Sequence, residues 1–174
     1  MAKRVSFSKK HLKIDDIVEY KEDLEQSLLF YYSNANNFEK FAFYSLSELN
    51  QEKKNRLQEL ENNCIFMLLS SIESWIRIDY EYRVKNRLKD ELSKELREID
   101  KTYDKTYKIS IDKLCDTYKK YFQGQIFSHI KSSFKLRHWF AHGRYWNPKL
   151  GKKYDFDEIY NLAFELNKLL NING

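Results

Sequence analysis

Glycine and proline are nearly absent from this chain. Four glycines and one proline occur in 174 residues, where average usage would give about twenty. Tight β-turns depend on these two residue types, so the sequence excludes a β-sandwich or β-barrel with many hairpins. Hydrophobic residues nevertheless make up 42% of the chain and aromatic residues 16%. This is enough to build a core, and it excludes a disordered protein.

Cysteines and long apolar runs are scarce as well. The two cysteines, Cys64 and Cys115, lie in apolar helical contexts, so we interpret both as buried thiols in a reducing compartment. The longest apolar run, residues 64–69, is too short to cross a bilayer. The basic, flexible N-terminal segment expected at residues 1–14 lacks the apolar stretch of a signal peptide. The sequence predicts a cytoplasmic protein with no membrane partner, folded as a single domain over residues 1–174.

Apolar residues recur at helical spacing through most of the chain. The clearest series runs from about residue 51 to about residue 88, and its middle, residues 64–72, is apolar on nearly every face. We therefore expect this helix to be the central and most buried element. A helix that carries Ile126 should end near His142, because Gly143 suits the position after a helix. Further helices are expected to begin at or near five positions: Asp15, Phe38, Asp90, Ser110 and Asp155.

No segment alternates between apolar and polar residues as a half-buried strand does. The expected helices lie close together in the sequence, with no long linker and no internal repeat. The sequence therefore predicts an all-α fold, a helical bundle of five to seven helices.

Acidic residues are absent between Thr117 and Tyr154. That stretch holds nine lysines and arginines, three of the four histidines and ten aromatic residues. The whole chain has a net charge of only +5, so the basic excess is local, and an anionic partner would neutralise it. Lysine and arginine can bind phosphates while aromatic rings stack on unpaired bases, which predicts RNA as a partner. The alternative is that the rings belong to the core and the lysines to a solvated face.

The string LRHWFAHGRYW at the centre of this stretch carries the candidate chemistry. Arg137 is followed by His138 and, after four intervening residues, by His142 at the expected helix end. Imidazole can act as a general base or acid near neutral pH, and a guanidinium matches phosphate oxygens. The two histidines also have the i,i+4 spacing of a metal-binding pair. Because no third ligand lies nearby in the sequence, we expect no metal.

The string resembles the Arg-x4-His motif of the HEPN superfamily (higher eukaryotes and prokaryotes nucleotide-binding), and more closely one prokaryotic HEPN subfamily. The segment SIESWIRIDY, residues 71–80, resembles the second-helix pattern of the same subfamily. The resemblance implies an all-α homodimer with Arg137 and His142 at the dimer cleft and Glu73 beside them. An ordinary i,i+4 ion pair between Glu73 and Arg77 is an equally good interpretation of that spacing.

The resemblance also implies a function. Many HEPN proteins are metal-independent endoribonucleases of toxin–antitoxin, abortive-infection or antiviral systems. For this chain it implies RNA cleavage by 2′-OH attack, without a cofactor, and an antitoxin or other defence protein as a partner. HEPN toxins paired with a nucleotidyltransferase antitoxin often have Tyr two residues after the His, where this chain has Arg144. Residues expected to bind RNA or support catalysis are Arg77, Asp79, His138, Arg144, Tyr145 and Lys149.

Two other functions are compatible with the same residues. Some HEPN proteins are inactive modules that bind RNA or a nucleotide. A helical protein could also use its basic stretch to dock an acidic protein partner. The presence of both Arg137 and His142 favours the enzyme over the inactive module.

Overall fold

The computed structural model describes residues 12–102, 109–122 and 125–170, and within these ranges the chain is helical and has no β-strand. Most of the basic segment expected at residues 1–14 lies outside the described residues. The six α-helices of the described ranges are α1 (Ile14–Ser33), α2 (Leu46–Lys85), α3 (Glu91–Thr102), α4 (Ile111–Tyr118), α5 (Ile126–Ala141) and α6 (Phe156–Leu170). The predicted all-α bundle of five to seven helices is thereby confirmed.

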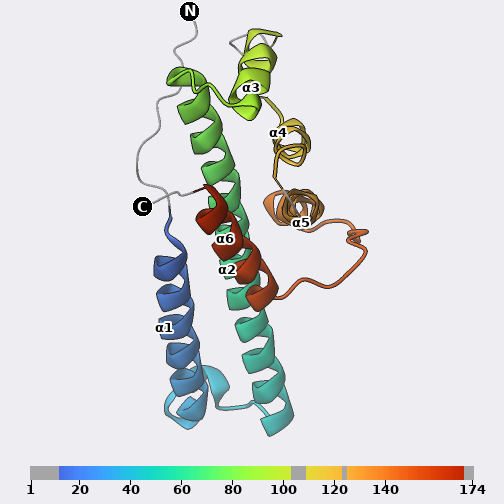
Figure 1. Cartoon of the computed structure of the whole chain (residues 1–174). Coiled ribbons are helices and arrows are strands. Elements are labelled where there is room, and N and C mark those ends of the chain that lie inside the picture. Colours follow the sequence, from blue (N-terminus) through green and yellow to red (C-terminus); the bar gives the residue numbers. More distant parts are fainter. Residues whose placement is uncertain (1–11, 103–108, 123–124, 171–174) are drawn as a thin grey trace, which may run out of the picture.

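Helix α2 is the axis of the molecule. Its 40 residues span about 60 Å at 1.5 Å per residue, and the other five α-helices pack along it (Figure 1). In the middle of α2, Cys64, Leu68 and Ile72 have no exposed surface. The prediction of a central, most buried helix is confirmed, because this segment is apolar on nearly every face and is covered from several directions.

The start of α2 differs from the predicted start near residue 51. The Ser45 hydroxyl accepts a hydrogen bond from the Glu48 N–H at 3.3 Å, and the Glu48 carboxylate accepts one from the Ser45 N–H at 2.8 Å. This capping box satisfies two N–H groups that the helix start leaves free, so the helix begins at Leu46. The helix expected near Phe38 is replaced by two short 3₁₀ turns, Ala35–Asn37 and Glu39–Phe41.

The helices divide into two groups around α2 (Figure 1). Helix α1 runs antiparallel to the first half of α2, and α6 packs beside both. Helices α3, α4 and α5 form a stack on another side of the second half of α2, where α4 and α5 are seen nearly end-on and therefore cross α2 steeply. None of the described helices is long and apolar enough to span a membrane.

Candidate functional site

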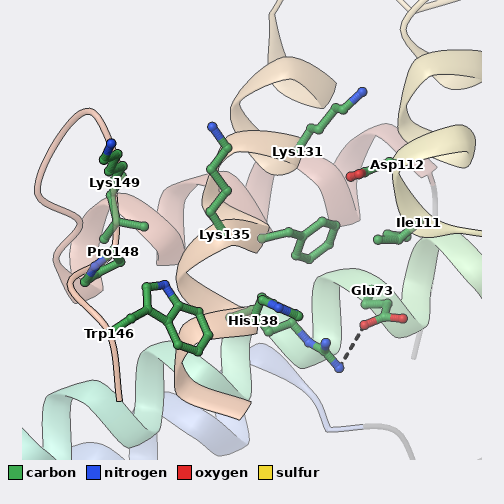
Figure 2. A pocket seen from close by; sticks show the side chains of 12 residues that line it. Glu73, Ile111, Asp112, Lys131, Lys135, His138, Trp146, Pro148 and Lys149 are labelled. Atoms are coloured by element: carbon green, nitrogen blue, oxygen red, sulfur yellow. Dashed lines mark ion pairs between the residues drawn. The ribbon is translucent and has the colours of Figure 1, made fainter. Parts of the chain in front are cut away.

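A pocket of about 460 Å³ lies where α5, the first turn of α4 and the loop after α5 approach α2 (Figure 2). Its lining includes four of the residues singled out in the sequence, namely Glu73, Arg137, His138 and Lys149. Residues that sequence reasoning missed also line it, among them Asp112, Lys131, Lys135 and Trp146.

The basic wall of the pocket is one face of α5. Lys131, Lys135, His138 and His142 follow one another at spacings of four, three and four residues, which puts them on one side of a helix. This stripe is the sequence signal that could have found the two missed lysines. Lys131 is held by an ion pair to Asp116 at 2.7 Å. Lys135 forms no ion pair with any other residue in the described ranges.

The C-terminus of α5 is closed by a Schellman motif, which turns the chain back over the helix. The Gly143 N–H donates to the Phe140 carbonyl at 3.3 Å, and the Arg144 N–H donates to the Trp139 carbonyl at 3.1 Å. Gly143 has a φ of 75°, a left-handed conformation that glycine adopts without strain. The helix therefore ends at Ala141 with His142 as its cap, which confirms the predicted end.

The returning loop places Trp146 against the two histidines. The Trp139 ring N–H donates to the Trp146 carbonyl at 2.6 Å and ties the loop to α5. The His138 and His142 ring centroids are 4.2 Å apart, and the Trp146 ring lies 5.8 Å from the first and 6.3 Å from the second. Both histidines are exposed. The fold thus presents two accessible imidazoles in contact, of which His138 lines the pocket and His142 lies outside its lining.

Arg137 is oriented by Glu73, an acidic residue of α2. Its guanidinium forms an ion pair with Glu73 at 2.8 Å, shown as the dashed line in Figure 2, and lies 5.8 Å from the centroid of the Phe66 ring. Glu73 also pairs with Arg77 at 2.8 Å, and Arg77 donates to the Ile109 carbonyl at 3.0 Å. The i,i+4 pair and the longer-range contact of Glu73 therefore exist together.

Arg137 is not saturated by these contacts. Its Nε is buried and has no hydrogen-bond acceptor among the described residues, while the side chain as a whole is 32% exposed. A buried N–H without an acceptor costs roughly 1–3 kcal/mol.

Arg144 and Tyr145 lie beside the pocket, and neither lines it. Arg144 forms two hydrogen bonds to the Glu59 carboxylate of α2, both 2.7 Å long. It does so from a left-handed backbone with a φ of 59°, which is uncommon for a residue other than glycine. The hydrogen bonds from Arg144 lower the pKa of the Glu59 carboxyl group. Arg144 therefore fastens the returning loop to α2, whereas the Tyr145 side chain is 83% exposed.

Asp79 belongs to a separate, buried cluster. Its carboxylate accepts hydrogen bonds of 2.6 Å from both Arg83 and the Tyr118 hydroxyl. Burial and the nearby Asp79 charge raise the pKa of Tyr118, so its hydroxyl stays protonated and remains a donor. These contacts join α2 to α4 and do not reach Arg137.

One histidine, His138, lines the pocket, and His142 lies next to it outside the lining. In the part of the chain that the structure describes, no three histidine, cysteine, aspartate or glutamate side chains form a metal-binding group. A scan against protein-family models, a search of curated proteins and a search of solved structures found no match to this chain. Support for a function therefore comes from the geometry of the pocket and from the resemblance to HEPN proteins.

Proposed function

We propose that this protein is a metal-independent endoribonuclease that binds RNA at the pocket between α4, α5 and the loop after α5. The observation that carries the proposal is the position of Arg137 in the pocket. It is oriented by Glu73 and its side chain is 32% exposed, and it lines a pocket together with His138 and Lys149. A partly exposed guanidinium in a cationic pocket is suited to an anionic ligand.

The two histidines supply the proton transfers that RNA cleavage needs. Attack of the 2′-OH on the adjacent phosphate requires a base to take the hydroxyl proton and an acid to protonate the departing 5′ oxygen. His138 and His142 are both accessible and lie with ring centroids 4.2 Å apart. One neutral and one protonated imidazole can share these tasks. Arg137 would stabilise the extra negative charge on the phosphate oxygens as the transition state forms.

The resemblance to HEPN proteins supports the biological part of the proposal. It favours a homodimer in which Arg137 and His142 of two chains face one cleft, and a role in a toxin–antitoxin, abortive-infection or antiviral system with an antitoxin or other defence protein as a partner. Arg144 stands where related toxins often carry a tyrosine. Its pairing with Glu59 makes it a structural residue of the loop in this chain.

A second candidate function uses the same pocket without catalysis. Lys135 and Lys149 line it and form no ion pair with other described residues, so both are available for phosphates. An RNA-binding module would need these cations and the aromatic side chains and would not need His142.

Replacement of His142 by alanine separates the two functions. We expect His142→Ala to lower the cleavage rate roughly 10²- to 10⁴-fold, with RNA affinity and the urea unfolding midpoint unchanged, because His142 is an exposed helix cap. Cleavage by the wild type should continue in EDTA and leave cyclic phosphate and 5′-hydroxyl ends. Wild-type activity in the variant, or its loss in EDTA, would contradict the mechanism. Salt-dependent binding without cleavage under any condition would favour the binding module.

Replacement of Lys149 by alanine tests the RNA-binding surface independently of the chemistry. We expect weaker RNA binding and a reduction of about one in the slope of log K against log salt concentration, as for the loss of one phosphate contact. The rate of the chemical step at saturating RNA should not change. Lys54, an exposed lysine of α2 that is absent from the lining of this pocket, provides the matched control, and its replacement by alanine should leave the slope as it is.

A further inference from the structure

One carboxylate in the cationic pocket has no hydrogen-bond or ion-pair partner among the described residues. Two acidic residues line the pocket, and Glu73 is paired with two arginines. Asp112, in the first turn of α4, is exposed and forms no hydrogen bond or ion pair with any other residue of the described ranges. Figure 2 shows Asp112 at one end of the pocket and Lys149 at the other. The pocket thus has a carboxylate at one end, beside Lys131, which is paired with Asp116, and Lys149 at the other end.

Apolar side chains and one lysine, Lys131, line the pocket beside Asp112. Ile111 precedes it in the chain and lies next to it in Figure 2, and Phe134 of α5 lines the same pocket. An apolar surface with a single carboxylate at its edge suits a flat heterocycle whose edge carries N–H groups. The volume of about 460 Å³ lies within the range of sites that bind small ligands.

We propose that the pocket holds one nucleotide of the RNA, with its phosphate toward Lys135 and Lys149 and its base edge at Asp112, and that Asp112 selects guanine. This inference rests on the proposed function and adds a base preference to it. A carboxylate only accepts hydrogen bonds. Guanine presents two adjacent N–H donors, N1–H and N2–H, to the two carboxylate oxygens. Adenine and cytosine present one amino group, and uracil presents one N–H between two carbonyl oxygens that a carboxylate repels.

The ordinary role of an acidic residue in the first turn of a helix is to interact with the helix dipole. That role affects stability and predicts no difference between bases. The decisive measurement is therefore a ratio of affinities for RNAs that differ in one base. Removal of a negative charge alone would strengthen binding to all RNAs equally and leave the ratio unchanged.

The experiment uses the full-length protein and short 2′-O-methyl oligouridylates, which cannot be cleaved by 2′-OH attack. Each carries one central base, either guanine, hypoxanthine, adenine, cytosine or uracil. We expect the guanine probe to bind about five- to tenfold more tightly than the uracil probe, as for one discriminating contact at an accessible edge. Hypoxanthine, which lacks only the N2 amino group of guanine, should lie between them.

The variant Asp112→Asn should lose most of the guanine-to-uracil ratio while keeping or increasing its affinity for the uracil probe. Asp116→Asn is the matched control. It removes the same charge one turn further along α4, and Asp116 pairs with Lys131 and does not line the pocket. It should keep the ratio. Equal binding of all probes by the wild type, or an unchanged ratio in Asp112→Asn, would overturn the base preference and leave the proposed ribonuclease standing. Failure of every probe to bind at any salt concentration would overturn both.

Discussion

Two arginine–carboxylate clusters lie within two turns of each other on α2, and they differ in how completely their polar atoms are satisfied. The inner cluster consists of Asp79, Arg83, Tyr118, Ser93 and Asp90. Asp79 accepts hydrogen bonds of 2.6 Å from Arg83 and Tyr118, and Arg83 also donates to the Ser93 hydroxyl at 3.3 Å. Ser93 in turn donates to Asp90 at 2.7 Å. Asp79 is only 7% exposed, yet its charge is paired and hydrogen-bonded.

In the pocket cluster, Glu73 pairs with two arginines, and one of these arginines has an N–H group without a hydrogen-bond acceptor among the described residues. Arg77 has a second acceptor in the Ile109 carbonyl, whereas Arg137 keeps a buried N–H without any. The same residue types on one helix therefore form two different kinds of cluster. The buried, fully hydrogen-bonded cluster joins helices, and the partly exposed one, beside Lys135 and Lys149, is suited to an anionic ligand.

The largest expected effect comes from breaking the inner cluster. Asp79→Ala leaves a largely buried Arg83 and the buried Tyr118 hydroxyl without their shared acceptor, and loss of one partner of a buried ion pair costs roughly 3–5 kcal/mol. We expect the free energy of unfolding in urea to fall by about that amount. Asp90→Ala, at the exposed end of the same network, removes the side-chain cap of α3, where the Ser93 N–H donates to the Asp90 carboxylate at 3.0 Å, and should cost only about 1 kcal/mol. Similar effects of the two changes would show that burial of Asp79 does not decide its contribution.

A smaller effect on stability is expected from the pocket cluster. Arg137→Met removes the unsatisfied N–H and leaves Glu73 paired with Arg77, so neither partner becomes an isolated buried charge. The unfolding free energy should change by less than about 1 kcal/mol, while RNA cleavage is lost. Urea unfolding and a cleavage assay on the same preparation give both values. A loss of stability as large as that of Asp79→Ala would make Arg137 a structural residue and contradict the comparison.

The smallest effect concerns the exposed pair between Arg144 and Glu59, and it depends on pH. Hydrogen bonds from Arg144 lower the pKa of Glu59 in the folded protein. Its contribution to stability is therefore present above the unfolded pKa of about 4.5 and is lost as the pH falls through the lower folded value. We expect the free energy of unfolding of the wild type to exceed that of Glu59→Gln by less than about 1 kcal/mol at pH 7. This difference should vanish in acid. A difference that persists at pH 2 would contradict an ionic origin.

Local signals in the sequence account for several helix boundaries. Gly143 marked the end of α5 because the position after the cap requires a left-handed backbone. Asp155 marked the start of α6, and its carboxylate accepts a hydrogen bond from the Glu158 N–H at 2.9 Å. The predicted start of α2 near residue 51 lies after the observed start at Leu46, because the Ser45–Glu48 capping box precedes a polar stretch in which hydrophobic periodicity gives no signal.

At the candidate site, local signals in the sequence predict which residues share a helix face but not which distant segments meet. The spacing of Lys131, Lys135 and His138 on α5 is contained in the sequence, because helical periodicity alone puts these residues on one face. The sequence by itself thus determined an all-helical chain, its buried central helix and a basic, histidine-bearing helix end. Only the tertiary structure brought Glu73 to Arg137 and Asp112 to the opposite end of the pocket from Lys149. Their meeting depends on how α2, α4 and the returning loop pack around α5, and packing between distant segments leaves no periodic trace in either one.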